Sequence, residues 1–95
     1  MSQLIVIAKI TAKSDQVDRV KSALLKLIEP TRQEDGCIQY DLHQDNEQPS
    51  VFVFYERWES TALLQKHMRS EHIKTYVAET EGALESFAIN QMNKI

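Results

Sequence analysis

The sequence predicts an α+β fold in which a four-stranded antiparallel sheet carries helices on one face. Two runs, 4–8 and 51–55, are apolar at every position. Successive side chains of a strand point to opposite faces of the sheet, so these two strands need apolar cover on both faces. Two further extended segments, 37–44 and 83–91, alternate between apolar and polar residues, as outer strands do.

The first strand is expected from about Gln3 to Ala12, followed by a helix that Ser14 caps. The helix carries one apolar stripe at helical spacing, made of Val17, Val20, Leu24, Leu27 and Ile28. Pro30 should end or kink it, because proline lacks the amide hydrogen that a helix interior needs.

A short helical turn is expected after Pro30, with Thr31 to Glu34 as its capping box and Gly36 as its end. The second strand then places Ile38, Tyr40 and Leu42 on one face. A polar turn over 45–50 leads into the third strand, which ends near Trp58. This strand must also accommodate either Glu56 or Arg57 among apolar residues, and an ion pair with a partner chain would do so.

The second helical region is expected to start at Ser60, and Ser70 caps a continuation or a separate helix with Ile73, Tyr76 and Val77 turned inward. Gly82 ends it, and the last strand follows, with Ala83, Phe87 and Ile89 on one face. The order βαββαβ is that of the split βαβ, or ferredoxin-like, arrangement, in which the first and third strands are central. These central strands are the two that need apolar cover on both faces. Because the helices cover only one face, a homodimer through the open sheet face is expected.

Composition limits the function. The 95 residues are enough for one domain, expected over 1–95, and the longest apolar run is far shorter than a membrane span. A net charge of −3 with scattered lysine and arginine disfavours nucleic acid. The N-terminus has no basic region before its apolar run, so a secretory signal is not expected. Cys37, the single cysteine, fits a reducing cytoplasm and is expected to be inert.

Two histidines are the candidate catalytic residues. His67 and His72 follow the third strand and can serve as acid–base groups or polar anchors, although His67 can also be a core histidine that bonds the backbone. A metal site built on both would need a third ligand that the sequence does not place, so neither a metal nor a cofactor is expected. Phe54, Trp58, Tyr76 and Met68 are the candidate walls of an apolar substrate pocket.

Several motifs together resemble the antibiotic biosynthesis monooxygenase family, and most closely its small quinol-monooxygenase-like members. They are Gly36-Cys37 with Tyr40 and Leu42, Tyr55-Glu56 with Trp58, and His67 with Ser70 and His72. The resemblance implies a dimeric α+β barrel with a pocket between sheet and helices in each protomer. It also implies oxygenation of a small aromatic or quinol by O₂ without flavin or metal, in which the protein binds and deprotonates the substrate.

The chain also departs from branches of this family. Phe54 stands where the aromatic oxygenases carry an asparagine. Ala8 and His67 stand where the haem-degrading branch carries its asparagine and tryptophan, so haem degradation is not expected. Two alternatives stay open: isomerisation of a phosphorylated dione, for which Arg57, Arg69 and Lys74 are the candidate phosphate ligands, and a ligand-binding dimer without catalysis.

Overall fold

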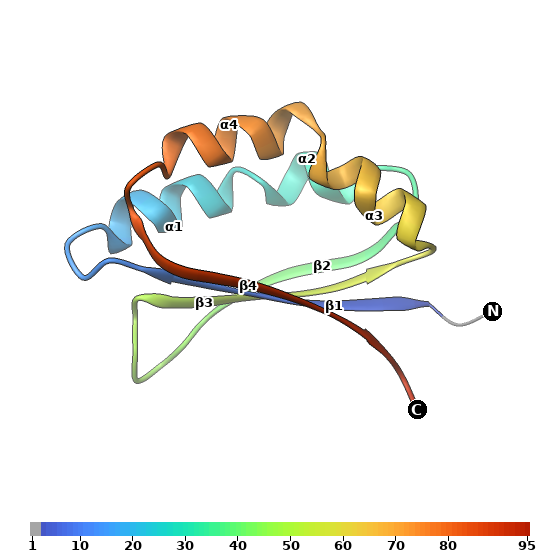
Figure 1. Cartoon of the computed structure of the whole chain (residues 1–95), viewed down its shortest axis with the longest axis horizontal. Helices are drawn as coiled ribbons and strands as arrows, with labels where there is room; N and C mark the ends of the chain where they lie inside the picture. The colour runs from blue at the N-terminus through green and yellow to red at the C-terminus, as the bar shows by residue number, and fades with distance from the viewer. Residues whose placement is uncertain (1–2) are drawn as a thin grey trace.

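The structure is a computed structural model and describes residues 3–95. One antiparallel sheet lies beneath a layer of helices (Figure 1), as the sequence predicts. The elements in chain order are β1 (Leu4–Ala12), α1 (Val17–Leu25), α2 (Ile28–Arg32), β2 (Cys37–Gln44), β3 (Val51–Trp58), α3 (Thr61–Met68), α4 (Glu71–Glu79) and β4 (Leu84–Asn93).

The strand order β2-β3-β1-β4 places β1 and β3 in the centre, which confirms the predicted ferredoxin-like α+β topology. In β2 the register shifts between Cys37 and Gln39. This β-bulge leaves Ile38 without a pairing position and 39% exposed, whereas Cys37 packs against the core. The prediction that Ile38 shares the apolar face of Tyr40 and Leu42 is therefore wrong, because a bulge resets the alternation of a strand.

All helices of the described chain lie over one face of the sheet (Figure 1). The apolar stripe predicted for α1 is confirmed, since Val20, Leu24 and Leu27 are buried and Val17 and Ile28 pack beside them. The helical run is interrupted at Lys26 and Leu27 rather than at the proline itself. Pro30 cannot donate a hydrogen bond to the carbonyl four residues earlier, that of Lys26, which explains a break one turn upstream.

The predicted caps are correct for the second helical region and wrong for the first. Ser60 and Ser70 cap α3 and α4, two separate helices, by accepting hydrogen bonds from the amides of Leu63 and Ile73. The N-cap of α1 is Gln16, not Ser14, and no side chain caps this end. Thr31 is a fully buried residue inside α2, so it cannot start a capping box there.

Val77, expected to point inward, and Phe87, expected on the apolar face of the last strand, both lie at the open edge of the core. Val77 on α4 is 59% exposed and Phe87 on β4 is 52% exposed. Figure 1 shows β4 at the edge of the sheet beneath α4, where no further strand covers it. Both residues line the mouth of a cavity between these two elements.

The second face of the sheet has no helices over it (Figure 1). The register places Ile5, Ile7, Val53 and Tyr55 together on this face, and all four are partly buried. Among residues 3–95, no helix is long and apolar enough to cross a membrane.

Candidate functional site

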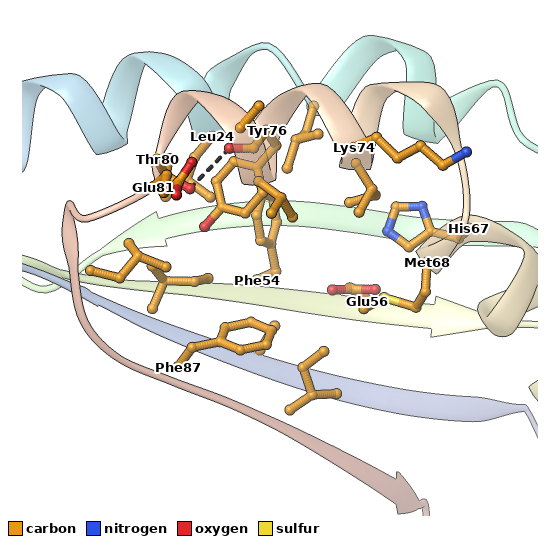
Figure 2. Close-up of a pocket in the computed structure, with 18 of the residues that line it drawn as sticks. Leu24, Phe54, Glu56, His67, Met68, Lys74, Tyr76, Thr80, Glu81 and Phe87 are labelled. Carbon is orange, nitrogen blue, oxygen red and sulfur yellow. Dashed lines mark hydrogen bonds between the residues drawn. The ribbon is translucent and has the colours of Figure 1, made fainter.

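A cavity of about 670 Å³ lies between the sheet and the helices. Its floor comes from all four strands, β2 contributing Tyr40, and its roof comes from α1, α3 and α4 (Figure 2). The wall is mostly apolar, and a few polar groups interrupt it. His67 and Glu56 lie at one end, Lys74 lies above them on α4, and Glu81 and Thr80 lie at the other end (Figure 2). A cavity of this kind suits a small apolar molecule with one or two polar groups.

One carboxylate oxygen joins the two candidate histidines. Oε2 of Glu34 lies 2.6 Å from Nδ1 of His67 and 2.7 Å from Nε2 of His72. Glu34 belongs to the turn between α2 and β2, whereas the histidines belong to α3 and α4. Three segments distant in sequence therefore converge on one oxygen atom, which accepts an N–H from each imidazole.

These bonds define the chemical state of His67. Its side chain is buried, and burial lowers the pKa of its imidazole below the ordinary value, although the bond to Glu34 opposes this shift. A neutral imidazole that donates from Nδ1 to a carboxylate keeps an unprotonated Nε2. The ring reaches the cavity end in Figure 2, so this nitrogen can accept a proton there.

The orientation of Glu34 depends on Gly36. Gly36 has a φ of +83°, a left-handed conformation that favours glycine. A Cβ atom at this position would overlap the Leu63 side chain of α3. The turn that carries Glu34 is therefore packed directly against the helix that carries His67, which keeps the two residues in register.

A second carboxyl group, that of Glu56, lies in the cavity wall. Glu56 is 4% exposed and its Oε1 accepts a hydrogen bond of 2.8 Å from the indole Nε1 of Trp58. The pKa of Glu56 rises from 4.5 to about 7, mainly because the group is buried; the indole bond opposes the rise and the nearby Glu34 adds to it. Within residues 3–95, no protein group forms a hydrogen bond with the second carboxyl oxygen of Glu56.

Aromatic rings hold this end of the cavity together. Tyr40 stacks on Phe54 with ring centroids 4.3 Å apart and meets His67 edge-on at 5.7 Å. The ring of Trp58 lies 4.9 Å from that of His67. These contacts are of the kind that fix the plane of a ring, and they add to the Glu34 bond in orienting His67.

The residues predicted for the site divide into two groups. His67, Phe54, Tyr76 and Met68 line the cavity. Trp58 is fully buried behind Glu56, and His72 lies behind Glu34, so neither forms part of the cavity wall.

Two site residues, Glu34 and Glu56, were not identified from the sequence. Glu34 was assigned to a helix cap, and no local pattern connects it to histidines more than 30 positions away. Glu56 did carry a signal, since it shares one strand face with Phe54 and Trp58. The expected ion pair with a partner chain is unnecessary, because the indole of Trp58 provides its hydrogen bond.

A metal site on the two histidines would need a third ligand, which the sequence does not place. In the structure Glu34 is the residue in that position. The ligand atoms of Glu34, His67 and His72 lie within 4.8 Å of one another. Two ligand atoms of one tetrahedral zinc ion lie about 3.3 Å apart, farther than the 2.6 and 2.7 Å found here. The three residues are therefore arranged as a hydrogen-bonded network and would have to separate to hold an ion.

Cys37 is close to this cluster, and its surroundings favour the protonated thiol. Burial and the acidic neighbours Glu56 and Glu34 raise the pKa of its thiol from 9.0 to about 11. Its one weak bond goes to the carbonyl of Gln39.

Comparison with known proteins places this site in a family. The family model described as "Antibiotic biosynthesis monooxygenase" matches residues 3–79. The chain belongs to this family. The match includes β1 to α4 and therefore Glu34, Glu56, His67 and His72.

The chain is also similar to individual proteins and to solved structures. A Mycobacterium tuberculosis protein named "Putative monooxygenase Rv0793" is 35% identical over 82% of this chain and 76% of its own length. A Synechocystis protein is 28% identical over 97% of this chain, which spans 63% of that relative, less than two thirds. The crystal structure of PA3566 from Pseudomonas aeruginosa superimposes with a TM-score of 0.96 at 34% identity, covering 100% of this chain and 96% of the other.

Proposed function

We propose that this family member is a cofactor-independent monooxygenase that oxidises a small aromatic or quinol-type molecule with O₂. The observation that carries the proposal is the Glu34–His67 pair at the end of an apolar cavity. The cavity accommodates the rings of such a substrate, and the pair supplies the base that its hydroxyl group requires.

His67 is the proposed base. Its Nε2 takes the proton of a substrate hydroxyl, and the electron pair of the broken O–H bond stays on the substrate as a phenolate. The bond from Nδ1 to Glu34 stabilises the imidazolium that forms. The electron-rich phenolate then reduces O₂ itself. For a quinol the sum is quinol plus O₂ giving a hydroxyquinone plus water, so both electron pairs come from the substrate.

The arrangement of cations supports this reaction over isomerisation of a phosphorylated dione. Arg57 lies on the open sheet face, where it bonds Gln3 and Gln39. Arg69 is an exposed residue at the end of α3. Of the three candidate phosphate ligands only Lys74 lines the cavity, whereas a phosphate group favours several cations together.

The test is oxygen uptake by metal-stripped, flavin-free protein with a panel of quinols and anthrones. Uptake above the autoxidation rate is expected, and His67→Gln should reduce it at least about a hundredfold, the usual loss when a general base is removed. The matched control is His43→Gln, because His43 is exposed on β2, away from the cavity. Melting curves of both variants separate loss of catalysis from loss of fold.

Wild-type protein that consumes no oxygen with any panel member contradicts the proposal. If the panel molecules still raise the melting temperature, the protein is a ligand-binding member of the family without O₂ chemistry.

We further propose that the protein works as a homodimer in the cytoplasm. The half-buried Ile5, Ile7, Val53 and Tyr55 on the open sheet face would be covered by the same face of a second copy. Sedimentation velocity should give a dimer for the wild type and a monomer for Ile7→Asp. A monomeric wild type at micromolar concentration contradicts this assembly.

A further inference from the structure

Glu56 is a buried acid without a cation. It lies between Phe54 and Trp58 on the helix-facing side of β3, and its register partners are Val6 on β1 and Tyr40 on β2. Its neighbour Arg57 points to the opposite face, where it bonds Gln39 and Gln3. Among residues 3–95, no ion pair involves Glu56, although it is almost completely buried.

The hydrogen bond from the indole of Trp58 occupies one oxygen of Glu56 and leaves the other available to a ligand. An indole N–H only donates, so Oε1 of Glu56 is an acceptor. A neutral carboxyl group keeps one further O–H donor. Glu56 belongs to the cavity wall and lies at the same end of the cavity as His67 (Figure 2). The O–H of a protonated Glu56 is therefore available to donate a hydrogen bond to a substrate in the cavity.

The charges around Glu56 favour its neutral form. From β2 it faces the thiol of Cys37 and the phenol of Tyr40, and from the α2–β2 turn the carboxylate of Glu34. From α3 it faces the neutral imidazole of His67, and Lys74 of α4 is the one cation in the cavity wall. Lys74 is exposed at the rim and makes no ion pair with Glu56.

We propose that Glu56 is a substrate-binding acid that donates a hydrogen bond to a carbonyl or phenol oxygen, so that the site selects uncharged aromatic molecules carrying such an acceptor. This inference rests on the proposed function for its catalytic meaning. When His67 takes the substrate proton, negative charge spreads onto a conjugated oxygen. Glu56 keeps its own proton, and its hydrogen bond strengthens as that charge grows.

The same geometry predicts which ligands the site rejects. A carboxylate or phosphate of a ligand would lie beside the carboxyl group of Glu56. An ionised Glu56 would repel this ligand, and a protonated Glu56 would be unable to ionise while the ligand is bound. A hydrocarbon without oxygen would fill the cavity but leave the donor without a partner. Recognition of an uncharged acceptor should weaken as the pH rises through the pKa of about 7, because the donor is lost.

The test is a binding measurement with a matched pair of probes that do not turn over. The probes are 1-tetralone, an aromatic ketone, and tetralin, which has the same carbon skeleton without the oxygen. Calorimetric titration of the full chain at pH 6 and pH 9 should show 1-tetralone binding about tenfold more weakly at pH 9, while tetralin changes little. In Glu56→Gln the amide donates at every pH, so the affinity for 1-tetralone should become independent of pH.

A second variant protects the test against a folding defect. Glu56→Leu should lose about tenfold in affinity for 1-tetralone at pH 6 and keep its affinity for tetralin. A pH dependence for 1-tetralone that is the same in wild type and Glu56→Gln would overturn the proposal, and so would equal losses for both probes in Glu56→Leu. Binding is measured without O₂, so this result is independent of whether the protein oxygenates a substrate.

Discussion

The two carboxyl groups of the site, Glu34 and Glu56, have the same chemistry and opposite environments. Glu34 lies in a turn and accepts N–H bonds from two imidazoles through a single oxygen. Glu56 lies on the central strand β3 and accepts one bond from an uncharged indole. The hydrogen-bond partners of Glu34 can become cations, whereas the indole that bonds Glu56 cannot.

This difference teaches how one small cavity can hold an acid and a base together. Glu34 accepts hydrogen bonds from two imidazoles, so it can orient His67 as a base. Burial without a cation keeps Glu56 partly protonated near neutral pH, so it can donate. The fold achieves this by taking Glu34 from a turn that reaches two helices and Glu56 from the strand beneath them.

The largest expected effect concerns stability and belongs to Glu56. Its pKa is about 7 in the folded protein, against an ordinary value of 4.5 for a glutamate in water, so the folded state binds a proton more tightly than the unfolded chain. Its contribution therefore lowers the free energy of unfolding by roughly 3 kcal/mol as the pH rises from 4.5 to 7, and the contribution is constant above that.

Glu56→Gln should remove this slope. Urea unfolding at pH 5 and pH 8 measures this change in the free energy of unfolding. At pH 8 the variant should be more stable than the wild type. Glu59→Gln, at an exposed position, is the control that should keep the wild-type slope. His67 contributes in the opposite direction only below its ordinary pKa of 6.5, because its folded pKa is depressed. Equal slopes in wild type and Glu56→Gln would mean that the two carboxyl groups do not differ as described.

The next effect concerns catalysis and belongs to Glu34. Glu34→Gln removes the charge that stabilises the His67 imidazolium, so kcat for oxygen uptake should fall by roughly a hundredfold with little change in KM. Glu29→Gln removes an exposed glutamate from the first turn of α2 and should have no effect. A loss confined to KM would show that Glu34 binds substrate instead of orienting the base.

The smallest effect should come from His72. His72→Asn removes one of the two imidazoles on Glu34 but leaves the 2.6 Å contact with His67 in place. Oxygen uptake should fall by about fivefold, the effect of one hydrogen bond worth about 1 kcal/mol. A loss as large as that of His67→Gln would mean that His72 itself acts on the substrate.

The sequence predicted the fold because apolar pattern and strand order agree. Continuous apolar runs mark the central strands β1 and β3, and Ser60 and Ser70 mark true helix starts. The errors come from local irregularities that an alternation pattern cannot contain. The bulge at Ile38 and the failure of Ser14 and Thr31 to cap a helix depend on backbone conformations that tertiary packing selects.

The site was less predictable than the fold. His67, Phe54, Tyr76 and Met68 could be found because aromatic and histidine side chains on one strand face and the facing helices converge on one cavity. Glu34 could not be found, because the contact of a turn with two helices depends on how these elements pack. The state of Glu56 depends on burial, which a single sequence does not record.

The packing of Gly36 against Leu63 has a consequence for how the site responds to change. Because a Cβ atom has no room there, the turn lies in close contact with the Leu63 side chain of α3. This packing contact supports the approach of Glu34 to His67 together with the hydrogen bond between them. Variants of the histidines or of Glu34 should therefore leave the backbone of the site in place. Such substitutions should change the chemistry of the side chains without changing the arrangement of the turn and α3.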